Sequence, residues 1–410
     1  MKLYEDLMYR GLIKDVASED LEKVLDGEPI AFYWGTDPTA DSLHLGHYSS
    51  LVTAKRLAKA GHHPILLVGG ATGLIGDPRP TAEREIISKD IIDSNVKAIK
   101  KQVLDIFDGN AEIVNNYDWF KEISWIDFLR DVGKYINVNY MLAKDIINRR
   151  LETGITFTEF AYTLMQGYDY LYLNETKNVT LECAGSDQWG NITTGVDLIS
   201  KKTGKTVNAF TMPLIVDSTG KKFGKSEGNA LWLDESKTSS YELYQYLINT
   251  DDAKVEEYLK VFTFLSKEEI EDTMSKHNAA PEQRIAQKEL ARAIITDLHG
   301  EESFNKALKI TNALFSGDIK SLNEDELKDA LNGVDTSNIS EDVNIVDMLV
   351  NTGILSSKRE AREFLTNGSI SLNGERITDL ELTITKDTCL YNKYLVVRRG
   401  KKKYHLVIFE

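Results

Sequence analysis

The sequence has few cysteines and no long apolar stretch, and both shortages limit what the protein can be. Its 410 residues include two cysteines, Cys183 and Cys389, far apart and without a Cys-x-x-Cys spacing. A disulfide framework and a zinc-finger site are therefore excluded, and we expect no protein-bound structural metal. No apolar run approaches the roughly 20 residues that span a bilayer, and residues 1–5 do not begin a signal peptide. We therefore expect a cytoplasmic protein with no membrane contact.

The composition is that of an ordinary globular chain, 42% hydrophobic and 28% charged. Its length allows about two to four domains. The net charge of −15 is unevenly distributed, because residues 343–410 hold 11 Lys and Arg against 8 Asp and Glu. This end carries +3 and the remainder −18. A small basic segment on an acidic body suggests a local polyanion site without general affinity for nucleic acid.

Four apolar runs in the first 230 residues have the length and composition of buried strands. They are residues 30–34, 64–70, 181–184 and 207–214. Residues 45–60 have a helical pattern, and a helical stretch rich in aromatic residues over about 118–178 is predicted to be an insertion between two halves of the sheet. Buried strands separated by helices favour a parallel sheet in an α/β fold.

The rest of the chain is predicted to form smaller parts. Ser266 begins a capping box, and Pro281 is expected to open a helix that closes before Gly300. Near the end, a helix that stops at residues 367–368 and a hairpin around residues 373–374 predict a small separate domain. The predicted division is 1–230 for the sheet domain, 231–320 for a helical domain, 321–342 for a linker and 343–410 for a small α+β domain.

Two histidines, His44 and His47, stand where a helix is predicted to begin. At this spacing both imidazoles lean to the same side of the first turn. A helix N-terminus attracts phosphate, and imidazole N–H groups can donate to it. Gly46 leaves room for a flat ring such as adenine. Capping and metal binding are the alternative interpretations, although no other cluster supplies a third zinc ligand.

Two lysines, Lys222 and Lys225, lie on either side of Gly224 in a second loop. Such a cationic loop suits a polyphosphate whose charge rises during transfer. An exposed surface turn is the alternative interpretation, since short lysine-glycine stretches are weak motifs on their own.

A third candidate site is one face of a predicted helix. Tyr162, Gln166 and Asp169 lie at i, i+4 and i+7, and residues 157–173 around them are largely apolar and aromatic. Burying a phenol, an amide and a carboxylate together is costly unless each has a partner. A solvated helix face is the alternative.

Basic residues gather in the last segment. Three of them fall in the first turns of a predicted helix, where cations oppose the helix dipole, so an external anion would compensate. A solvated helix face is again the alternative. The candidate polyanion-binding residues are Lys358, Arg359, Arg362, Arg398, Arg399, Lys401, Lys402 and Lys403.

The histidine and lysine loops are far more specific together than apart. His-x-Gly-His, followed about 180 residues later by Lys-x-x-Lys-Ser, resembles the two signatures of class I aminoacyl-tRNA synthetases. The resemblance extends along nearly the whole chain and narrows to the bacterial tyrosyl-tRNA synthetases. It is carried by residues 68–78, 115–119, 185–191 and 248–252. It implies a Rossmann-like catalytic domain and, in residues 343–410, a small RNA-binding domain similar to one found at the C-terminus of that family.

The resemblance implies a two-step reaction on L-tyrosine, ATP and tRNA(Tyr). The tyrosine carboxylate attacks the α-phosphorus of ATP to give tyrosyl-adenylate and pyrophosphate, and the terminal adenosine of the tRNA then takes the tyrosine. Because the nucleophile is already a carboxylate, positioning and charge stabilisation carry the chemistry. Mg²⁺ accompanies ATP as the phosphate counter-ion. The family is homodimeric, which places an expected interface in the aromatic insertion around residues 125–157.

The resemblance also implies roles for individual residues. Asp169 would accept the phenolic O–H of tyrosine with Tyr33 as second partner, and phenylalanine would leave both unpartnered. The implied tyrosine-binding residues are Tyr33, Asp77, Tyr162, Gln166, Asp169 and Gln188. The implied ATP-binding residues are Gly35, Asp37, Gly46, Asp187, Gln188, Lys225 and Ser226. The implied catalytic residues are His44, His47, Lys222, Lys225 and Thr39.

The sequence departs from the family pattern at three places. The loop after Asp77 lacks a lysine that many relatives carry, and Arg79 or Arg84 is the candidate to supply that charge. Glu182 stands where glutamine is common, which alters the charge near the ammonium of the substrate. Trp34 is bulkier than the residue often found there, which predicts a tighter adenine slot.

Three other functions share some of these features. A tryptophanyl-tRNA synthetase has both loops, but an indole needs one acceptor and no phenol partner, so Tyr33 with Asp169 argues against it. A non-catalytic RNA-binding protein built on a former synthetase would not need both cationic loops. A small-molecule nucleotidyltransferase would not need the basic segment.

Overall fold

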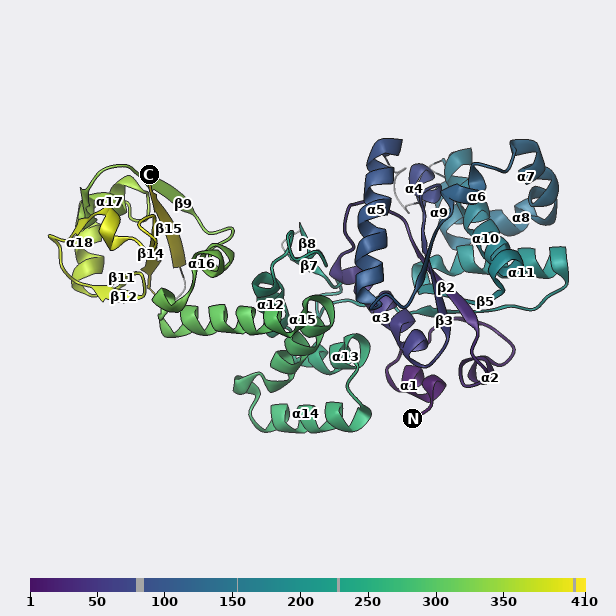
Figure 1. Cartoon of the computed structure of the whole chain (residues 1–410), viewed down its shortest axis with the longest axis horizontal. Helices are drawn as coiled ribbons and strands as arrows, with labels where there is room; N and C mark the ends of the chain where they lie inside the picture. The colour runs from purple at the N-terminus through teal and green to yellow at the C-terminus, as the bar shows by residue number, and fades with distance from the viewer. Residues whose placement is uncertain (79–84, 153, 227–228, 401–402) are drawn as a thin grey trace. The chain divides into compact units, whose positions relative to one another are not determined.

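The computed structural model describes the chain except for residues 79–84, 153, 227–228 and 401–402 (Figure 1). The described residues form two compact units. The first comprises residues 1–238 and 247–298, and the second comprises residues 239–246 and 299–410.

A six-stranded sheet forms the centre of the first unit, in the order β1-β6-β5-β2-β3-β4. Neighbouring strands are parallel except β1, which is antiparallel to β6. Their bounds are β1 (Val16–Ala17), β2 (Ala31–Thr36), β3 (His63–Val68), β4 (Glu112–Asn115), β5 (Val179–Gly185) and β6 (Asn208–Met212). The apolar side chains of the central strands are buried, as expected where helices cover both faces. The carboxyl ends of five parallel strands therefore meet at one edge.

Helices connect and cover these strands (Figure 1). Those before β5 are α1 (Leu3–Tyr9), α2 (Leu21–Leu25), α3 (Leu45–Lys59), α4 (Thr72–Ile75), α5 (Lys89–Ile106), α6 (Tyr117–Phe120), α7 (Trp125–Asp131), η1 (Gly133–Tyr135), α8 (Val138–Leu142), α9 (Asp145–Leu151) and α10 (Phe157–Lys177). After β5 come η2 (Ser186–Gln188), α11 (Trp189–Thr203), the short strands β7 (Lys225–Ser226) and β8 (Asn229–Ala230), α13 (Asp252–Phe262), α14 (Lys267–Ala279) and η3 (Pro281–Gln283). Two helices, α12 (Ser240–Ile248) and α15 (Ile285–Ser316), have residues in both units.

The second unit contains a five-stranded sheet in the order β12-β11-β14-β15-β9 and a two-stranded pair of β10 with β13. Alternate residues of β14 enter two apolar clusters: Leu395 and Val397 pack with α17 and α18, whereas Tyr394 and Val396 pack with α16 and the end of α15. The elements are η4 (Ile319–Ser321), α16 (Glu324–Ala330), β9 (Thr336–Ile339), β10 (Val343–Asn344), α17 (Ile345–Asn351), α18 (Lys358–Thr366), β11 (Ile370–Leu372), β12 (Glu375–Ile377), β13 (Thr383–Ile384), η5 (Lys386–Thr388), β14 (Tyr394–Arg399) and β15 (Lys403–Phe409).

The structure confirms the predicted strands, the helix at residues 45–60 and the capping box at Ser266. Two expectations are wrong. Pro281 opens only a 3-10 turn, and α15 begins at Ile285 and runs to Ser316 with a break in helical geometry at Gly300. Residues 321–342 are not an irregular linker, because they contain α16 and the edge strand β9, which pairs in parallel with β15. Among the described residues, no helix combines the length and apolar composition needed to cross a bilayer.

Candidate active site

Asp37 links the ends of two neighbouring strands with α10. It follows β2, and its carboxylate accepts hydrogen bonds from Thr72 Oγ1 at 2.7 Å and from Tyr162 Oη at 2.9 Å. Gly69, at the end of β3, is essential to this arrangement, because a Cβ there would lie 2.3 Å from Asp37 Oδ1. Asp37 was assigned to the nucleotide and Tyr162 to the amino acid, and the structure brings the two side chains into direct contact.

Asp169 is held by two side chains that the sequence analysis gave no role. It is 2% exposed on α10, and it accepts from Asn116 Nδ2 at 3.0 Å and from Trp119 Nε1 at 2.9 Å. Asn116 Nδ2 also donates to Thr72 Oγ1 at 2.9 Å, so the network reaches Asp37. Burial raises the pKa of Asp169 well above its usual range, although both hydrogen bonds act in the opposite direction. The solvated-face alternative for this helix is excluded.

Tyr33 and Glu182 are a further pair of buried polar residues in this part of the sheet. They are paired residues of β2 and β5, and each is 2% exposed. Glu182 Oε1 accepts from Gln166 Nε2 at 3.4 Å, and the Tyr33 hydroxyl interacts with the Glu182 carboxyl group. Within the described part of the chain, Tyr33 Oη and Glu182 Oε2 have no closer hydrogen-bond partner. Burial raises the pKa of Glu182 to about 7, and burial together with the Glu182 carboxylate raises the pKa of Tyr33 well above its usual value.

Asp77 follows α4. Its carboxylate accepts from Gln188 Nε2 at 3.2 Å and from Asn191 Nδ2 at 3.3 Å, and Asn191 also donates to Gln188 Oε1 at 2.9 Å. Gln188 is thereby oriented by the first turn of α11. The sequence predicts that Tyr162, Gln166 and Asp169 need partners that a ligand would supply, but each already has a hydrogen-bond partner in the protein.

The two histidines form the N-terminus of α3. His44 Nδ1 accepts from the Gly46 amide at 3.1 Å, and His47 Nδ1 accepts from the His44 amide at 3.3 Å, so the imidazoles stack with centroids 3.9 Å apart. Both Nδ1 atoms are acceptors, which places the proton of each neutral ring on Nε2. Burial, with smaller contributions from the neighbouring His44 and Lys222, lowers the pKa of His47 to about 3. The capping interpretation is thus correct, and it also presents two N–H donors.

The lysine loop packs against this helix start. Gly224 has φ +86°, and a Cβ there would lie 2.7 Å from the Gly46 nitrogen. Phe223 anchors the loop, because it is buried and its ring centroid lies 4.6 Å from that of Phe262. Lys222, next to Phe223, is exposed. Gly224 and Gly46, which are about 180 residues apart in the sequence, are thereby brought into contact beside the two histidines.

The remaining nucleotide residues lie at the surface of the same edge. Gly35, Thr39, Gly46 and Asp187 are exposed, while the strand residues Lys225 and Ser226 form β7. Trp34 is not exposed at this edge of the sheet, because its side chain is 2% exposed and its indole N–H donates to Ser50 Oγ at 3.0 Å. Its bulk fills the space between β2 and α3. Arg79 and Arg84 lie outside the described residues.

The basic residues of the second unit are only partly available. Arg359 and Arg362 are exposed on α18, and Lys358 is exposed but forms an ion pair with Asp347 at 2.6 Å. The half-buried Arg399 donates to the Ile354 carbonyl at 2.9 Å and lies over the Phe364 ring of α18. Arg398 is also half-buried, Lys403 is exposed, and Lys401 and Lys402 lie outside the described residues.

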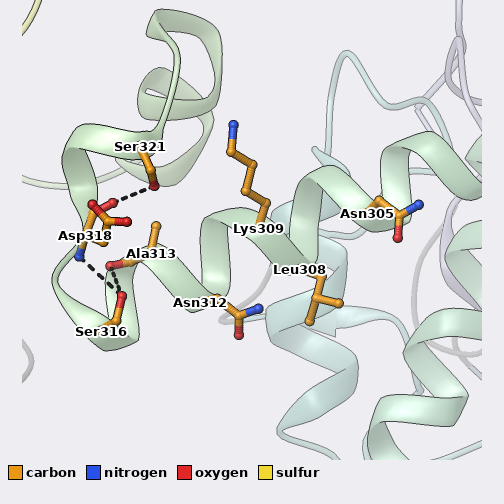
Figure 2. Close-up of a pocket in the computed structure, with 8 residues that line it drawn as sticks. All are labelled: Asn305, Leu308, Lys309, Asn312, Ala313, Ser316, Asp318 and Ser321. Carbon is orange, nitrogen blue, oxygen red and sulfur yellow. Dashed lines mark hydrogen bonds between the residues drawn. The ribbon is translucent and has the colours of Figure 1, made fainter.

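A hollow of about 400 Å³ lies elsewhere, along the second half of α15 (Figure 2). Asp318 at its end accepts from Ser321 Oγ at 2.7 Å, and its amide donates to Ser316 Oγ. Its lining contains none of the residues assigned above to tyrosine, ATP or RNA. The side chains assigned to tyrosine and ATP therefore lie at the carboxyl edge of the six-stranded sheet and not in this hollow.

The sequence analysis missed two amides and a hydroxyl that support the site at this edge. Asn116, Asn191 and Thr72 each hold a carboxylate in place. All three directly follow a strand or begin the next helix at the carboxyl edge of the sheet, and that position was the available signal.

Comparisons with known proteins agree over the whole chain. The family model described as "tRNA synthetases class I (W and Y)" matches residues 25–316, and that described as "Tyrosine--tRNA ligase SYY-like C-terminal domain" matches residues 326–407. The chain is 52% identical over 418 residues to a tyrosine–tRNA ligase of Streptococcus pneumoniae, with 100% of both chains covered.

Solved structures give the same answer for the fold. A truncated mitochondrial tyrosyl-tRNA synthetase of Aspergillus nidulans matches with a TM-score of 0.69 and 32% identity, over 77% of this chain and 94% of that one. A tyrosyl-tRNA synthetase of Archaeoglobus fulgidus complexed with L-tyrosine matches with a TM-score of 0.56 and 17% identity, over 75% of this chain and 100% of that one. The second similarity shows a shared fold.

Proposed function

The chain belongs to the class I tyrosyl-tRNA synthetases. We propose that L-tyrosine binds to the buried network on α10, and that ATP binds to the N-terminus of α3 and the lysine loop. The enzyme is a tyrosine–tRNA ligase: it joins tyrosine to ATP as tyrosyl-adenylate, with release of pyrophosphate, and transfers tyrosine to the terminal adenosine of tRNA. The proposal concerns which side chains perform each part. The observation that carries it is the contact between Gly224 and Gly46, which sets the lysine loop on the histidine pair.

The amino-acid side of the site is the buried network on α10. Asp169 accepts the phenolic O–H of the ligand, since a carboxylate retains acceptor capacity after the two bonds from Asn116 and Trp119. Tyr33 supplies the second partner with its buried hydroxyl. The α-ammonium is held by Asp77, together with Tyr162 and Gln166. Phenylalanine would leave the Tyr33 hydroxyl without a partner, which opposes its binding.

The nucleotide side is the N-terminus of α3 and the lysine loop. His44 and His47 donate from Nε2 to the phosphates as neutral rings, in line with the hydrogen bonds that occupy both Nδ1 atoms. Lys222 and Lys225 stabilise the charge that develops on the leaving pyrophosphate. Thr39 contacts the pyrophosphate, Asp187 accepts from the ribose, and Gln188, held by Asp77, donates to the α-phosphate. Mg²⁺ would arrive with ATP as the counter-ion of its phosphates.

We also propose a cytoplasmic homodimer. The insertion exposes large apolar side chains on neighbouring helices, among them Trp125 at 57%, Ile126 at 73% and Phe157 at 62% exposure. Trp125 and Phe157 contact each other edge to face with centroids 6.0 Å apart. Exposed apolar clusters of this kind mark protein interfaces. Ile126→Asp should shift the protein from dimer to monomer in analytical ultracentrifugation.

The deciding experiment is amino-acid-dependent ATP–pyrophosphate exchange, measured with each of the twenty amino acids. We expect exchange with tyrosine, and exchange with phenylalanine or tryptophan only at much higher concentrations. Equal exchange with tryptophan would contradict the assigned phenol pocket. Tyr33→Phe should reduce the preference for tyrosine over phenylalanine, because it removes the second phenol partner.

A further inference from the structure

Two buried polar groups in the amino-acid pocket, the Tyr33 hydroxyl and the Glu182 carboxyl group, interact with each other, and among the described residues Tyr33 Oη and Glu182 Oε2 have no closer hydrogen-bond partner. Tyr33 Oη and Glu182 Oε2 belong to paired residues of adjacent parallel strands, so both side chains project from the same face of the sheet. Both residues are 2% exposed. Leaving a buried polar group without a partner is costly, so such atoms in a binding site indicate a contact that forms with the ligand.

Glu182 has an unusual environment for a carboxyl group. One of its oxygens receives a long hydrogen bond from Gln166 at 3.4 Å, and the Tyr33 hydroxyl also interacts with the carboxyl group. The titratable groups that face it are Tyr33 on β2, Asp169 and Tyr170 on α10, and its neighbour Cys183. None of these is a cation. Burial raises the pKa of Glu182 to about 7, although the hydrogen bonds with Tyr33 and Gln166 act in the opposite direction, so both protonation states are populated near neutrality.

The protonation state of Glu182 decides what the single Tyr33 hydrogen can do. An ionised Glu182 can only accept, so it takes the Tyr33 O–H and leaves Tyr33 with lone pairs alone. A protonated Glu182 can donate to Tyr33 Oη, which frees the Tyr33 O–H. Because the phenolic O–H of a bound tyrosine is given to Asp169, the phenol oxygen needs a donor, and only the second arrangement supplies it.

We propose that Glu182 is a positioning residue for tyrosine recognition: in its protonated form it donates to Tyr33 and turns the Tyr33 hydroxyl toward the phenol oxygen of the substrate. The proposal rests on the function assigned to Tyr33 and Asp169 above. It makes tyrosine affinity depend on pH with a defined sign. Ionisation of Glu182 competes with the ligand, so affinity is full below the pKa of this group and is lost as the pH rises through it.

The test is equilibrium binding of L-tyrosine without ATP, measured by calorimetry between pH 6 and pH 8.5. For the unmodified protein we expect the tyrosine Kd to rise about tenfold between pH 6 and pH 8. The reason is that the fraction of protonated Glu182 falls by about a factor of ten between one pH unit below its pKa and one pH unit above it. Glu182→Gln keeps a side-chain N–H donor at every pH and should give a nearly constant Kd. Glu175→Gln, an exposed change on α10 with the same loss of charge, should follow the unmodified protein.

Tyr33→Phe separates the possible failures. If Glu182 acts through Tyr33, this variant binds tyrosine more weakly and shows no slope with pH. A slope that persists in Tyr33→Phe means that Glu182 contacts the ligand directly, and a slope that persists in Glu182→Gln means that another group titrates; either overturns the proposal while leaving the phenol pocket intact. Unchanged tyrosine affinity in Tyr33→Phe at every pH would instead overturn the pocket assignment itself.

Discussion

Gly224 of the lysine loop lies against Gly46 at the start of α3, so close that a Cβ on residue 224 would come within 2.7 Å of the Gly46 nitrogen. This contact joins the two loops that carry the positive charge and the N–H donors of the site. It leaves no room for a side chain, and the φ of +86° at Gly224 also disfavours one.

Gly224→Ala should therefore disrupt the nucleotide side of the site. A left-handed alanine alone costs roughly 1–2 kcal/mol, and the clash with Gly46 adds displacement of the loop. We expect a large fall in the rate of pyrophosphate exchange with little change in the tyrosine Kd. Gly220→Ala is the matched control, because Gly220 has φ +83° but no atom within 4 Å of its Cβ position. If both variants lose the same activity, the contact with Gly46 has no special role.

Asp169→Asn should weaken tyrosine activation by orders of magnitude while the KM for ATP changes little. An asparagine has one acceptor oxygen for the two donors that Asp169 now satisfies, so Trp119 or Asn116 is left facing an N–H group. The free energy of unfolding should fall by about 1–3 kcal/mol, as for other buried unpartnered donors. Urea unfolding and exchange kinetics measure the two effects. Asp118→Asn, an exposed change beside Trp119, serves as control; equal losses for tyrosine and ATP would make Asp169 only structural.

His47 should act as a neutral donor at every working pH. Its pKa is lowered to about 3, so it carries no charge between pH 6 and pH 9. The ratio of exchange rates between the unmodified protein and His47→Gln should therefore stay constant over this range, and His47→Ala should lose more than His47→Gln. A ratio that changes near pH 6.5 would show that the imidazolium is the active form.

The same shift affects stability at low pH. The unfolded chain binds a proton on His47 below about pH 6.5, whereas the folded protein resists it until about pH 3. Stability due to this residue is therefore lost as the pH falls from 6.5, and His47→Gln should lose less stability than the unmodified protein over that interval.

Reversing the charges of Arg359 and Arg362 should impair tRNA charging without affecting pyrophosphate exchange. Both side chains are exposed at the start of α18. Phosphate contacts make binding depend on salt, so the double change Arg359→Glu and Arg362→Glu should raise the KM for tRNA and reduce its salt dependence. Lys386→Glu with Lys393→Glu changes the same net charge at exposed positions outside the cluster. Equal losses in both double variants would assign the effect to overall charge.

Much of the fold could be predicted because local physics decides it. The apolar runs that form β2, β3 and β5 are hydrophobic enough to be buried in any compact arrangement of the chain. The N-terminus of α3 is fixed by His44 and His47, which are only three residues apart. The region at 321–342 could not be predicted, because it is polar. Its strand β9 exists only because β15, about 70 residues later, offers a free edge.

For this protein the sequence alone indicated the reaction through a resemblance: the histidine loop, the lysine loop and the polar face of α10 lie in short stretches that resemble those of a known family, and such stretches can be recognised without a fold. Only the tertiary structure decided how those groups are held. Asn116 and Trp119 secure Asp169 from about 50 residues away, and Glu182 meets Tyr33 across two strands whose register no local pattern specifies. Hydrogen bonds of this kind depend on distances between elements, and such distances are set by the packing of the whole sheet.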